Sequence, residues 1–308
     1  MRDGIVVLGS FVADVAFRAA RLPAWGETLM GSGFALGPGG KGSNQAVAAA
    51  RAGARVKMIS RLGEDAFGRL ARETWAADGI DASLVGSCDV ATGSAVILID
   101  EVSGQNAIIV VPGACFTLTA EDVEAAGEAI RSAAVLLVQL ELPVATVERG
   151  LRLAREAGVV TILNPAPAQE LSDEVLGLVD YLIPNESEAA LLTGMAVETV
   201  AQAESAARVL LARGARNVIV TLGAQGALVC AGGAEAAVVA AFDAGAVVET
   251  TGAGDAFCGG FAAALGEGRT VLEAARFGCA TAGISVTRAG TAPSMPTREE
   301  IEAMLAER

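Results

Sequence analysis

The 308-residue chain contains no histidine, and this absence excludes a wide range of chemistry. Ser-His-Asp and Cys-His catalysis both need an imidazole, as does any metal site with histidine ligands. Cysteine is also scarce: the five cysteines are widely spaced and never form a CxxC pair, which argues against a disulfide framework and a zinc site. Buried free thiols are the expected state of these residues.

Aromatic residues are rare as well, at 4% of the chain, although 53% of the residues are hydrophobic. The core must therefore be built mainly from Ala, Val, Leu and Ile, which favours helices packed on buried strands. The length is sufficient to bury a substantial core, and one major domain is expected.

Positively charged residues are in the minority: the chain has 22 Lys and Arg but 36 Asp and Glu, which gives a formal net charge of −14. The general field repels polyanions, which argues against nucleic-acid and anionic-membrane partners, so any phosphate ligand must be captured locally. The start, MRDGIVVLGS, has an acid where a signal peptide is basic, and no apolar run is long enough to span a membrane. A soluble cytoplasmic protein is expected.

Strand-like and helix-like segments alternate along most of the chain. GIVVLGS near the N-terminus predicts a buried strand, and SNQAVAAARAG predicts a helix with Ser43 as its cap and Gly53 as its stop. The alternation continues from Val56 to Leu222, and two alanine-rich helices are predicted near residues 255–265 and 271–287. This βαβ pattern is typical of a parallel sheet covered by helices.

Two strand-rich segments interrupt that pattern. Residues 11–40 contain short alternating stretches such as VADVAF, and residues 92–111 resemble a hairpin. We expect the two segments to pair as a small β lid. Residues 1–308 would then form a single domain, with lid segments of about 12–38 and 92–111 inserted in the main α/β body.

The segment GPGGKGSNQ, residues 37–45, suggests a phosphate-binding P-loop but does not match one. The pattern GxxxxGK[ST] would need glycine at Ala35 and a hydroxyl residue at Gly42. What remains is a glycine-lined turn that lets the backbone approach a ligand, with Lys41 and Asn44 directing hydrogen-bonding groups at it. A tight turn between a strand and a helix, without a ligand, is the alternative.

The segment ETTGAGDAF, residues 249–257, places flexible backbone beside a single acid. Gly252, Ala253 and Gly254 precede an apolar helix and can present consecutive N–H groups to an anion, assisted by the helix dipole. Asp255 could simply stabilise the first turn of that helix. A carboxylate beside a bound phosphate makes chemical sense if it accepts the proton of a hydroxyl that attacks the phosphorus.

Both segments resemble the signatures of the PfkB carbohydrate kinases, in the order found in that family. Other segments resemble its ribokinase group over essentially the whole chain: GSFVAD, GGKGSNQAVAA, QLELP, LNPAPA, IPNESEA, TLGAQG and VTRAGTAPSMPTREEI. The resemblance implies a ribokinase-like α/β fold, in which a mainly parallel sheet lies between two helical layers and carries a small β lid. It also implies an ATP-dependent kinase that phosphorylates a primary hydroxyl of a sugar, with ribose, converted to ribose 5-phosphate, as the first candidate.

The resemblance assigns roles to individual residues. Asp255 is implied to be the catalytic base, in contact with the substrate, and Gly252, Ala253 and Gly254 to form the anion hole. The residues implied to hold the sugar are Asp14, Gly40, Lys41, Asn44, Glu141 and Asp255. A polyol needs several such polar groups, because each unpaired hydroxyl would cost affinity.

Cofactors follow from the same resemblance, which implies ATP, Mg²⁺ and K⁺. The residues that match ATP-binding segments are Asn185, Thr221, Gly223, Gly226, Gly254 and Cys279. Asn185 and Glu188 match a motif that orders magnesium and phosphate, although Asn185 could instead cap the following helix. The residues that match the monovalent-cation loops, mostly through backbone carbonyls, are Glu249, Thr251, Ser285, Gly290 and Ser294.

Two positions depart from the pattern of this group. Glu249 stands where the family usually has aspartate, and its side chain is one methylene longer. A shift of the cation loops is therefore an alternative to a functional potassium site. Val12 stands where ribokinases commonly have an asparagine that can bind a sugar hydroxyl, so a deoxypentose is an alternative acceptor. The resemblance further implies a homodimer formed through the lids.

Other acceptors within the family are fructose, another ketose or a nucleoside, although the shortage of aromatic residues disfavours a nucleoside. A sugar-binding regulator that lost phosphate transfer is a possibility from a different class. The retained acid at Asp255 argues against it, because a sensor has no need of a base beside the phosphate.

Overall fold

Nine strands within residues 2–307, the part of the chain that the structure describes, form one large sheet in a computed structural model. Their order is β13-β12-β11-β10-β9-β8-β1-β4-β5. The strands are β1 Ile5–Leu8, β4 Val56–Gly63, β5 Asp81–Cys88, β8 Val135–Val138, β9 Val160–Leu163, β10 Tyr181–Leu182, β11 Asn217–Thr221, β12 Ala227–Ala231 and β13 Ala237–Val239. All pairs from β5 to β11 are parallel. Only β11–β12 and β12–β13 are antiparallel, so the predicted mainly parallel sheet is confirmed.

Both faces of this sheet are covered by helices. In β1, Ile5 and Val7 belong to one core cluster, whereas Val6 and Leu8 belong to the other. A strand buried on both faces has no polar side, which is why β1 is a continuous apolar run. The helices of the first face are α1 Lys41–Arg51, α2 Ala66–Ala77, α9 Ala253–Gly266, α10 Val271–Ser285 and α11 Arg298–Ala306. Those of the second face are α3 Ala120–Ala125, α4 Gly127–Ser132, α5 Val144–Ala157, α6 Asp173–Leu176, α7 Glu186–Thr193 and α8 Val200–Ala212.

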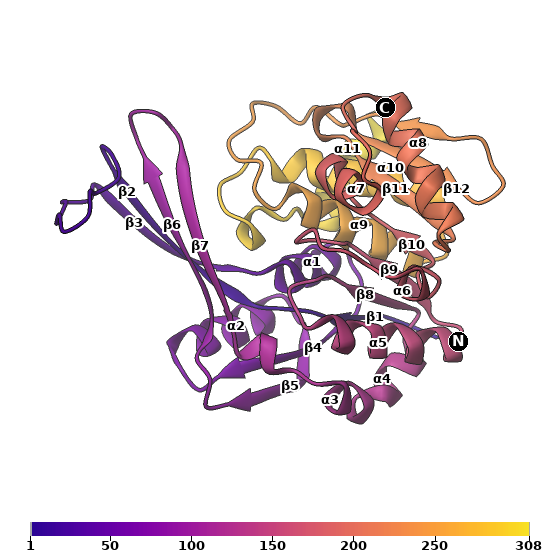
Figure 1. The fold of residues 1–308 in the computed structure, drawn as a ribbon, viewed down its shortest axis with the longest axis horizontal. Coiled ribbons are helices and arrows are strands. Elements are labelled where there is room, and N and C mark those ends of the chain that lie inside the picture. Colours follow the sequence, from indigo (N-terminus) through magenta and orange to yellow (C-terminus); the bar gives the residue numbers. More distant parts are fainter. Residues whose placement is uncertain (1, 308) are drawn as a thin grey trace.

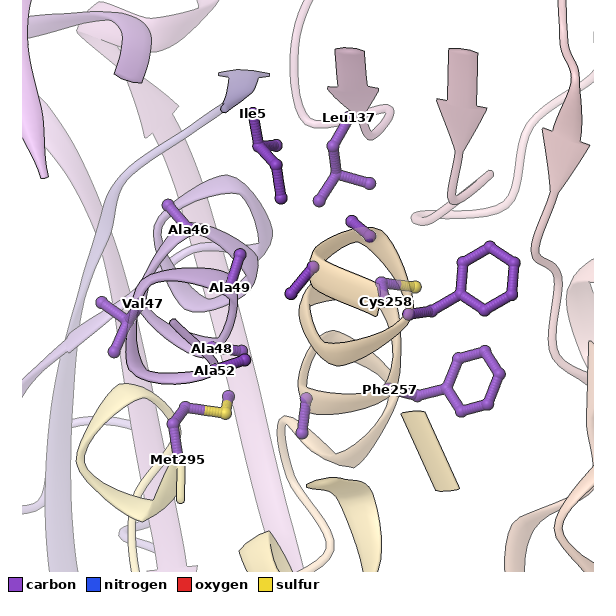
Figure 2. Packing of buried hydrophobic residues seen from close by; sticks show 14 of the residues in the cluster. Ile5, Ala46, Val47, Ala48, Ala49, Ala52, Leu137, Phe257, Cys258 and Met295 are labelled. Atoms are coloured by element: carbon purple, nitrogen blue, oxygen red, sulfur yellow. The ribbon is translucent and has the colours of Figure 1, made fainter. Parts of the chain in front are cut away.

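Small side chains fill the space between α1 and α9. Figure 2 shows Ala48 and Ala49 of α1 and its C-cap Ala52 beside α9, with Phe257 and Cys258 on α9 and Ile5 and Leu137 from the sheet. Because alanine is short, the two helices approach closely, which compensates for the scarcity of aromatic residues in this core. The close approach also brings the N-terminal turns of α1 and α9 together.

A second sheet, here called the lid, contains β2 Val12–Ala19, β3 Gly33–Gly39, β6 Thr92–Asp100 and β7 Asn106–Gly113 in the order β3-β2-β6-β7. The segment before α1 therefore pairs with the 92–111 hairpin. The junction is the parallel pair β2–β6, and the outer pairs are antiparallel. Figure 1 shows the lid extending away from the body of the molecule.

One predicted helix boundary is wrong. Helix α1 begins at Lys41 with Gly40 as its N-cap, so Ser43 lies inside the helix, where its hydroxyl accepts a hydrogen bond from Trp75 Nε1 at 2.9 Å. Glycines before a helix give no capping side chain, and for this reason the next serine looked like the cap. Gly53 follows the C-cap Ala52 with φ +98°, as expected of a helix stop. Within residues 2–307, the helices are too short or too polar to cross a membrane.

Candidate active site

Polar side chains collect where neighbouring parallel strands end. Ser10 follows β1, Gln139 and Glu141 follow β8, and Asn164 and Asn185 follow β9 and β10. The carboxyl ends of parallel strands lie at one edge of a sheet, where α/β proteins commonly bind ligands. The N-terminal turn of α1 faces this same edge, because the Lys41 N–H and Gln45 Nε2 donate to Glu141 and Asn164. The first turn of α9 lies beside it, because Asp255 accepts a hydrogen bond from Gln45.

The turn before α1 is built on close backbone contact. Gly40 has φ +85°, and a Cβ there would lie 2.6 Å from the backbone nitrogen of Val12, so no larger residue fits. This packing places the Lys41 N–H 2.8 Å from Glu141 Oε2, which also accepts a hydrogen bond from Ser10 Oγ. Gly40, Lys41 and Glu141, all predicted sugar-site residues, are therefore adjacent.

Asp255 lies in the first turn of α9 with its side chain buried, at 6% relative exposure. Each carboxylate oxygen receives one amide N–H donor: Asn44 Nδ2 donates to Oδ2 at 3.0 Å, and Gln45 Nε2 donates to Oδ1 at 2.9 Å. A carboxylate has further acceptor capacity, so Asp255 can still accept a hydroxyl proton. The structure thus brings together the predicted base and Asn44 from opposite ends of the chain.

The N-terminus of α9 supplies backbone donors next to Asp255. Gly252 is the N-cap in a left-handed conformation, φ +84°. The Ala253 N–H donates to the Thr250 carbonyl at 3.2 Å, whereas the N–H groups of Gly252 and Gly254 have no acceptor within residues 2–307. Two of the three predicted anion-hole donors are therefore available at the positive end of a helix of 14 residues.

Asp14, on lid strand β2, is a predicted sugar-site residue whose carboxyl group is strongly affected by its surroundings. Burial, and then the negative charge of Glu141, raise the pKa of Asp14 to about 6. Burial also raises the pKa of Glu141, while the charge of Asp255 raises the pKa of Lys41 and keeps its ammonium protonated. The carboxylates of Asp255, Glu141 and Glu188 thus place negative charge around Lys41. With Asp14 beside Glu141 on the lid strand, the arrangement is suited to several hydroxyl groups.

A cavity of about 530 Å³ opens on the other side of the α9 N-terminus, a volume typical of small-molecule sites. The predicted ATP residues in its walls are Asn185, Thr221, Gly223, Gly226, Gly254 and Cys279. Burial raises the pKa of the Cys279 thiol to about 12, so this thiol is uncharged at neutral pH. Phe242, Ala282, Gly283 and Val286 complete it but lie in segments without a motif, so sequence patterns could not identify them.

Asn185 is the N-cap of α7, which was one of its two predicted roles. Its Oδ1 accepts the Glu188 N–H at 2.8 Å, and Glu188 Oε2 accepts the Asn185 N–H at 2.9 Å. Glu188 Oε1 accepts a further bond from Asn185 Nδ2, so both carboxylate oxygens are engaged. The cap and a ligand role are compatible, because Asn185 also lines the cavity.

A magnesium ion fits here only as a cation held chiefly by the phosphates and water, the usual mode of Mg²⁺ with ATP. Glu188 contributes negative charge while remaining in its cap, and the residues from 2 to 307 offer no cluster of three His, Cys, Asp or Glu able to hold a metal.

Glu249 joins the two predicted cation loops. Its Oε2 accepts the Gly290 N–H at 2.8 Å, so the longer side chain still ties the segment before α9 to the loop after α10. The next residue, Thr291, donates to the Pro38 carbonyl of the lid at 2.9 Å. The hydroxyls of Ser285 and Ser294 bond to the backbone carbonyls of Ala282 and Thr291, and Thr251 precedes the N-cap of α9.

Three buried amides behind Asp255, those of Gln45, Gln139 and Asn164, were not predicted as site residues. They lie in GGKGSNQ, QLELP and LNPAPA, and each of the last two follows a strand of the large sheet. A polar residue directly after a buried strand was the available signal. Their mutual contact could not be predicted, because they are brought together only by the tertiary fold.

Comparison with known proteins matches the chain over nearly its full length. The family model described as pfkB family carbohydrate kinase matches residues 2–298. A ribokinase of Haemophilus influenzae is 42% identical over 301 residues, covering 97% of both chains. A deoxyribokinase of Salmonella typhimurium is 35% identical over 302 residues, covering 98% of both. The structure of Arabidopsis thaliana ribokinase complexed with ribose and ATP superimposes with a TM-score of 0.92 at 35% identity, covering 99% of both chains.

Proposed function

The chain belongs to the pfkB family of carbohydrate kinases, and we propose that it transfers the γ-phosphate of ATP to the primary hydroxyl of ribose, giving ribose 5-phosphate. The observation that carries this proposal is the position of Asp255, a buried carboxylate between the sugar-site residues and the N–H groups at the start of α9. The similarity to ribokinases, one of them solved with ribose and ATP, supports the choice of both substrates.

The chemical step uses Asp255 as a general base. The proton of the sugar hydroxyl passes to its carboxylate while the hydroxyl oxygen forms a bond to the γ-phosphorus. The bond from that phosphorus to the bridging oxygen breaks, and its electron pair leaves with ADP. The Gly252 and Gly254 N–H groups, at the positive end of α9, stabilise the negative charge on the transferred group.

ATP occupies the cavity of about 530 Å³, with its base against the apolar wall that contains Phe242 and Cys279. Its phosphates extend toward Gly254, the cavity residue nearest in sequence to Asp255. Magnesium, when bound with ATP, neutralises charge on the phosphate oxygens. Asn185 and Glu188 hold the turn beside these phosphates.

The sugar lies on the lid side of Asp255, where Asp14, Gly40, Lys41, Asn44 and Glu141 provide donors and acceptors. Asn44 Oδ1 is a buried oxygen that has no partner among residues 2–307. A sugar hydroxyl would supply the missing donor, and buried polar atoms are rarely left unpaired in native proteins. Closure of the lid would exclude water and limit wasteful hydrolysis of ATP.

Deoxyribose is a second candidate acceptor, favoured by one residue. Val12 is buried and lies two residues before Asp14 in β2, so both side chains are on the same face of the strand. Valine cannot bond to a hydroxyl, and the similarity to a deoxyribokinase is nearly as extensive as that to ribokinases.

A coupled assay over ribose, 2-deoxyribose, fructose, other ketoses and nucleosides discriminates these acceptors by kcat/KM. We expect ribose to rank first, because Asp14 and Glu141 can accept hydrogen bonds from several hydroxyls. A deoxypentose has one hydroxyl fewer and would leave an acceptor unpaired. A higher value for another acceptor would replace ribose. Sugar binding in calorimetry without any ATP consumption would instead support a regulator.

We infer that the same assay responds to potassium. The loops joined by Glu249 and Gly290 lie directly behind the α9 N-terminus, so a cation bound between them would adjust the anion hole. Addition of K⁺ to a buffer with an organic monovalent cation is expected to raise kcat. An unchanged kcat would mean that Glu249 alone fixes these loops.

We propose a homodimer formed through the lids. Consecutive residues of β7 are exposed, with Ile109 at 69% and Val110 at 54%, so both faces of this edge strand carry uncovered apolar side chains. One face can cover the sugar, and a second lid would cover the other. We expect light scattering to give a dimer at micromolar concentration, and Ile109→Lys to shift it toward monomer. Leu191→Lys, at an exposed apolar residue of α7, serves as the control, and a monomeric parent protein would contradict the proposal.

A further inference from the structure

We propose that Gln45 is a positioning residue for the catalytic base, and that Gln139 and Asn164 fix its amide so that the N–H end faces Asp255. The inference rests on the proposed function, in which Asp255 accepts the hydroxyl proton. It concerns a chain of buried amides that runs from the backbone carbonyl of Ile183 to the Asp255 carboxylate.

The direction of each amide in this chain is determined by groups that cannot reverse. The Ile183 carbonyl only accepts, so Asn164 faces it with Nδ2, at 2.9 Å, and turns Oδ1 toward Gln45. The Asp255 carboxylate also only accepts when it is ionised. Gln45 Nε2 is placed between these two acceptors, 3.1 Å from Asn164 Oδ1 and 2.9 Å from Asp255 Oδ1.

Gln139 secures the other end of Gln45. Its Nε2 donates to Gln45 Oε1 at 2.6 Å, which would be lost if the Gln45 amide flipped. A flip would also turn Oε1 toward the carboxylate and place two acceptors in contact. The three amides therefore hold Gln45 in a single orientation, and Gln45 in turn holds Asp255 Oδ1.

Burial gives these contacts their strength. Gln45 has no exposed surface, Gln139 is 1% exposed and Asn164 is 8% exposed. In a water-poor environment, a hydrogen bond to a charged group is stronger than a neutral one, and no water molecule can take its place readily. Loss of the Gln45 donor would leave Asp255 held only by Asn44, so the carboxylate could rotate away from the sugar hydroxyl.

Helix packing brings Gln45 within reach of Asp255. At Gly259 of α9, a Cβ would lie 2.6 Å from the Gln45 backbone oxygen and 2.5 Å from Ala48 Cβ. Only glycine permits this contact between α9 and α1. Gly259 is one helical turn after Asp255, so the same contact sets the distance between the two side chains.

Within residues 2–307, this chain of amides leaves one buried oxygen without a hydrogen-bond partner, a cost in stability that packing of the fold does not explain. Gln139 Oε1 is buried and has no partner within the described part of the chain. Apolar side chains of similar size would fill this space between the sheet and α1 without an unpaired oxygen. Retention of three amides is consistent with a role in catalysis.

The test compares Gln45→Met, Gln139→Met and the double variant by kcat, by the KM values for ribose and ATP, and by thermal unfolding. Methionine keeps the length of glutamine but donates no hydrogen bond. We expect Gln45→Met to lower kcat by about 10²-fold, the scale of a misplaced catalytic group, with both KM values nearly unchanged. Gln139→Met should give a smaller loss of kcat, and the double variant should match Gln45→Met, because Gln139 acts through Gln45.

Gln202→Met is the matched control, because it removes two capping hydrogen bonds of α8, far from Asp255 in sequence. It should lower the unfolding temperature without changing kcat. Parental kcat in Gln45→Met and Gln139→Met, with Asp255→Asn inactive, would overturn the inference and leave the proposed function intact. Full turnover by Asp255→Asn would overturn the proposed function itself. If Gln45→Met does not fold, the kcat of Gln139→Met decides alone.

Discussion

Asp255→Asn is expected to reduce kcat by about 10²-fold or more, because an amide cannot accept the hydroxyl proton as a carboxylate does. Ribose binding should persist within a small factor, since Asp14, Lys41 and Glu141 remain in place. Asparagine is close to aspartate in shape, although its amide group must share the site with the Asn44 and Gln45 donors. Steady-state rates with ribose and MgATP, together with calorimetry of ribose binding, measure both effects.

Asp89→Asn serves as the matched control, because Asp89 is exposed in the turn between β5 and β6. It should retain parental rates. If Asp255→Asn turned over within a few fold of the parent protein, the proton would have another acceptor. The buried carboxylate would then be a helix-stabilising acid, as the first turn of α9 also allows.

Asp14→Asn is expected to raise the KM for ribose by about 10²-fold, since hydrogen bonds to charged groups contribute about 1.5–3 kcal/mol each. The KM for ATP should change little, because Asp14 lies on lid strand β2 and is absent from the walls of the nucleotide cavity. An equal increase in both KM values would show that Asp14 supports the fold of the site in general.

The pH dependence of ribose affinity provides an independent check on the same carboxyl. With its pKa raised to about 6, Asp14 is ionised at pH 7.5 and becomes protonated as the pH falls through 6. Protonation removes acceptor capacity, so the KM for ribose should rise below pH 6 in the parent protein. Asp14→Asn should lack this rise, whereas Asp89→Asn should keep it. A rise that persisted in Asp14→Asn would assign the titration to Glu141, whose pKa burial also raises.

Much of the fold was predictable because its strands are buried on both faces. Continuous apolar runs such as IVVL and VLLV, separated by amphipathic helices, indicate a parallel sheet without any structural knowledge. The parallel pairing of β2 with β6 was not predictable, because register between segments 80 residues apart leaves no local signal.

The residues of the candidate site likewise differ in how far the sequence predicts them, depending on whether they carry a local sequence signal. Residues inside long motifs, such as Asp255, Asn44 and Lys41, were predicted as site residues from the sequence, and the structure places them close together. Gln139 and Asn164 directly follow buried strands, but this pattern alone assigns them no role. Their role depends on contact with Gln45, which the structure shows. Glu249 shows an intermediate case: the departure from aspartate was evident in the sequence, but its bond to Gly290 required the fold.

Capping residues were the least predictable feature. Ser43 follows glycines and looks like an N-cap, yet backbone contact at Gly40 starts the helix earlier. Asn185 was predicted in two roles, and the structure places it both in a capping box and in the cavity wall. Local sequence signals cannot decide between such roles, because a capping side chain at the end of a strand also lies where ligands bind.

The most direct test of the central proposal is phosphorus NMR of the products formed by the purified protein from ribose, ATP and magnesium. We predict ADP and one new phosphomonoester in equal amounts, with the phosphate coupled to the two protons on C5 of ribose. Release of inorganic phosphate without a sugar ester, or an ester at another carbon, would contradict the proposed transfer to the primary hydroxyl.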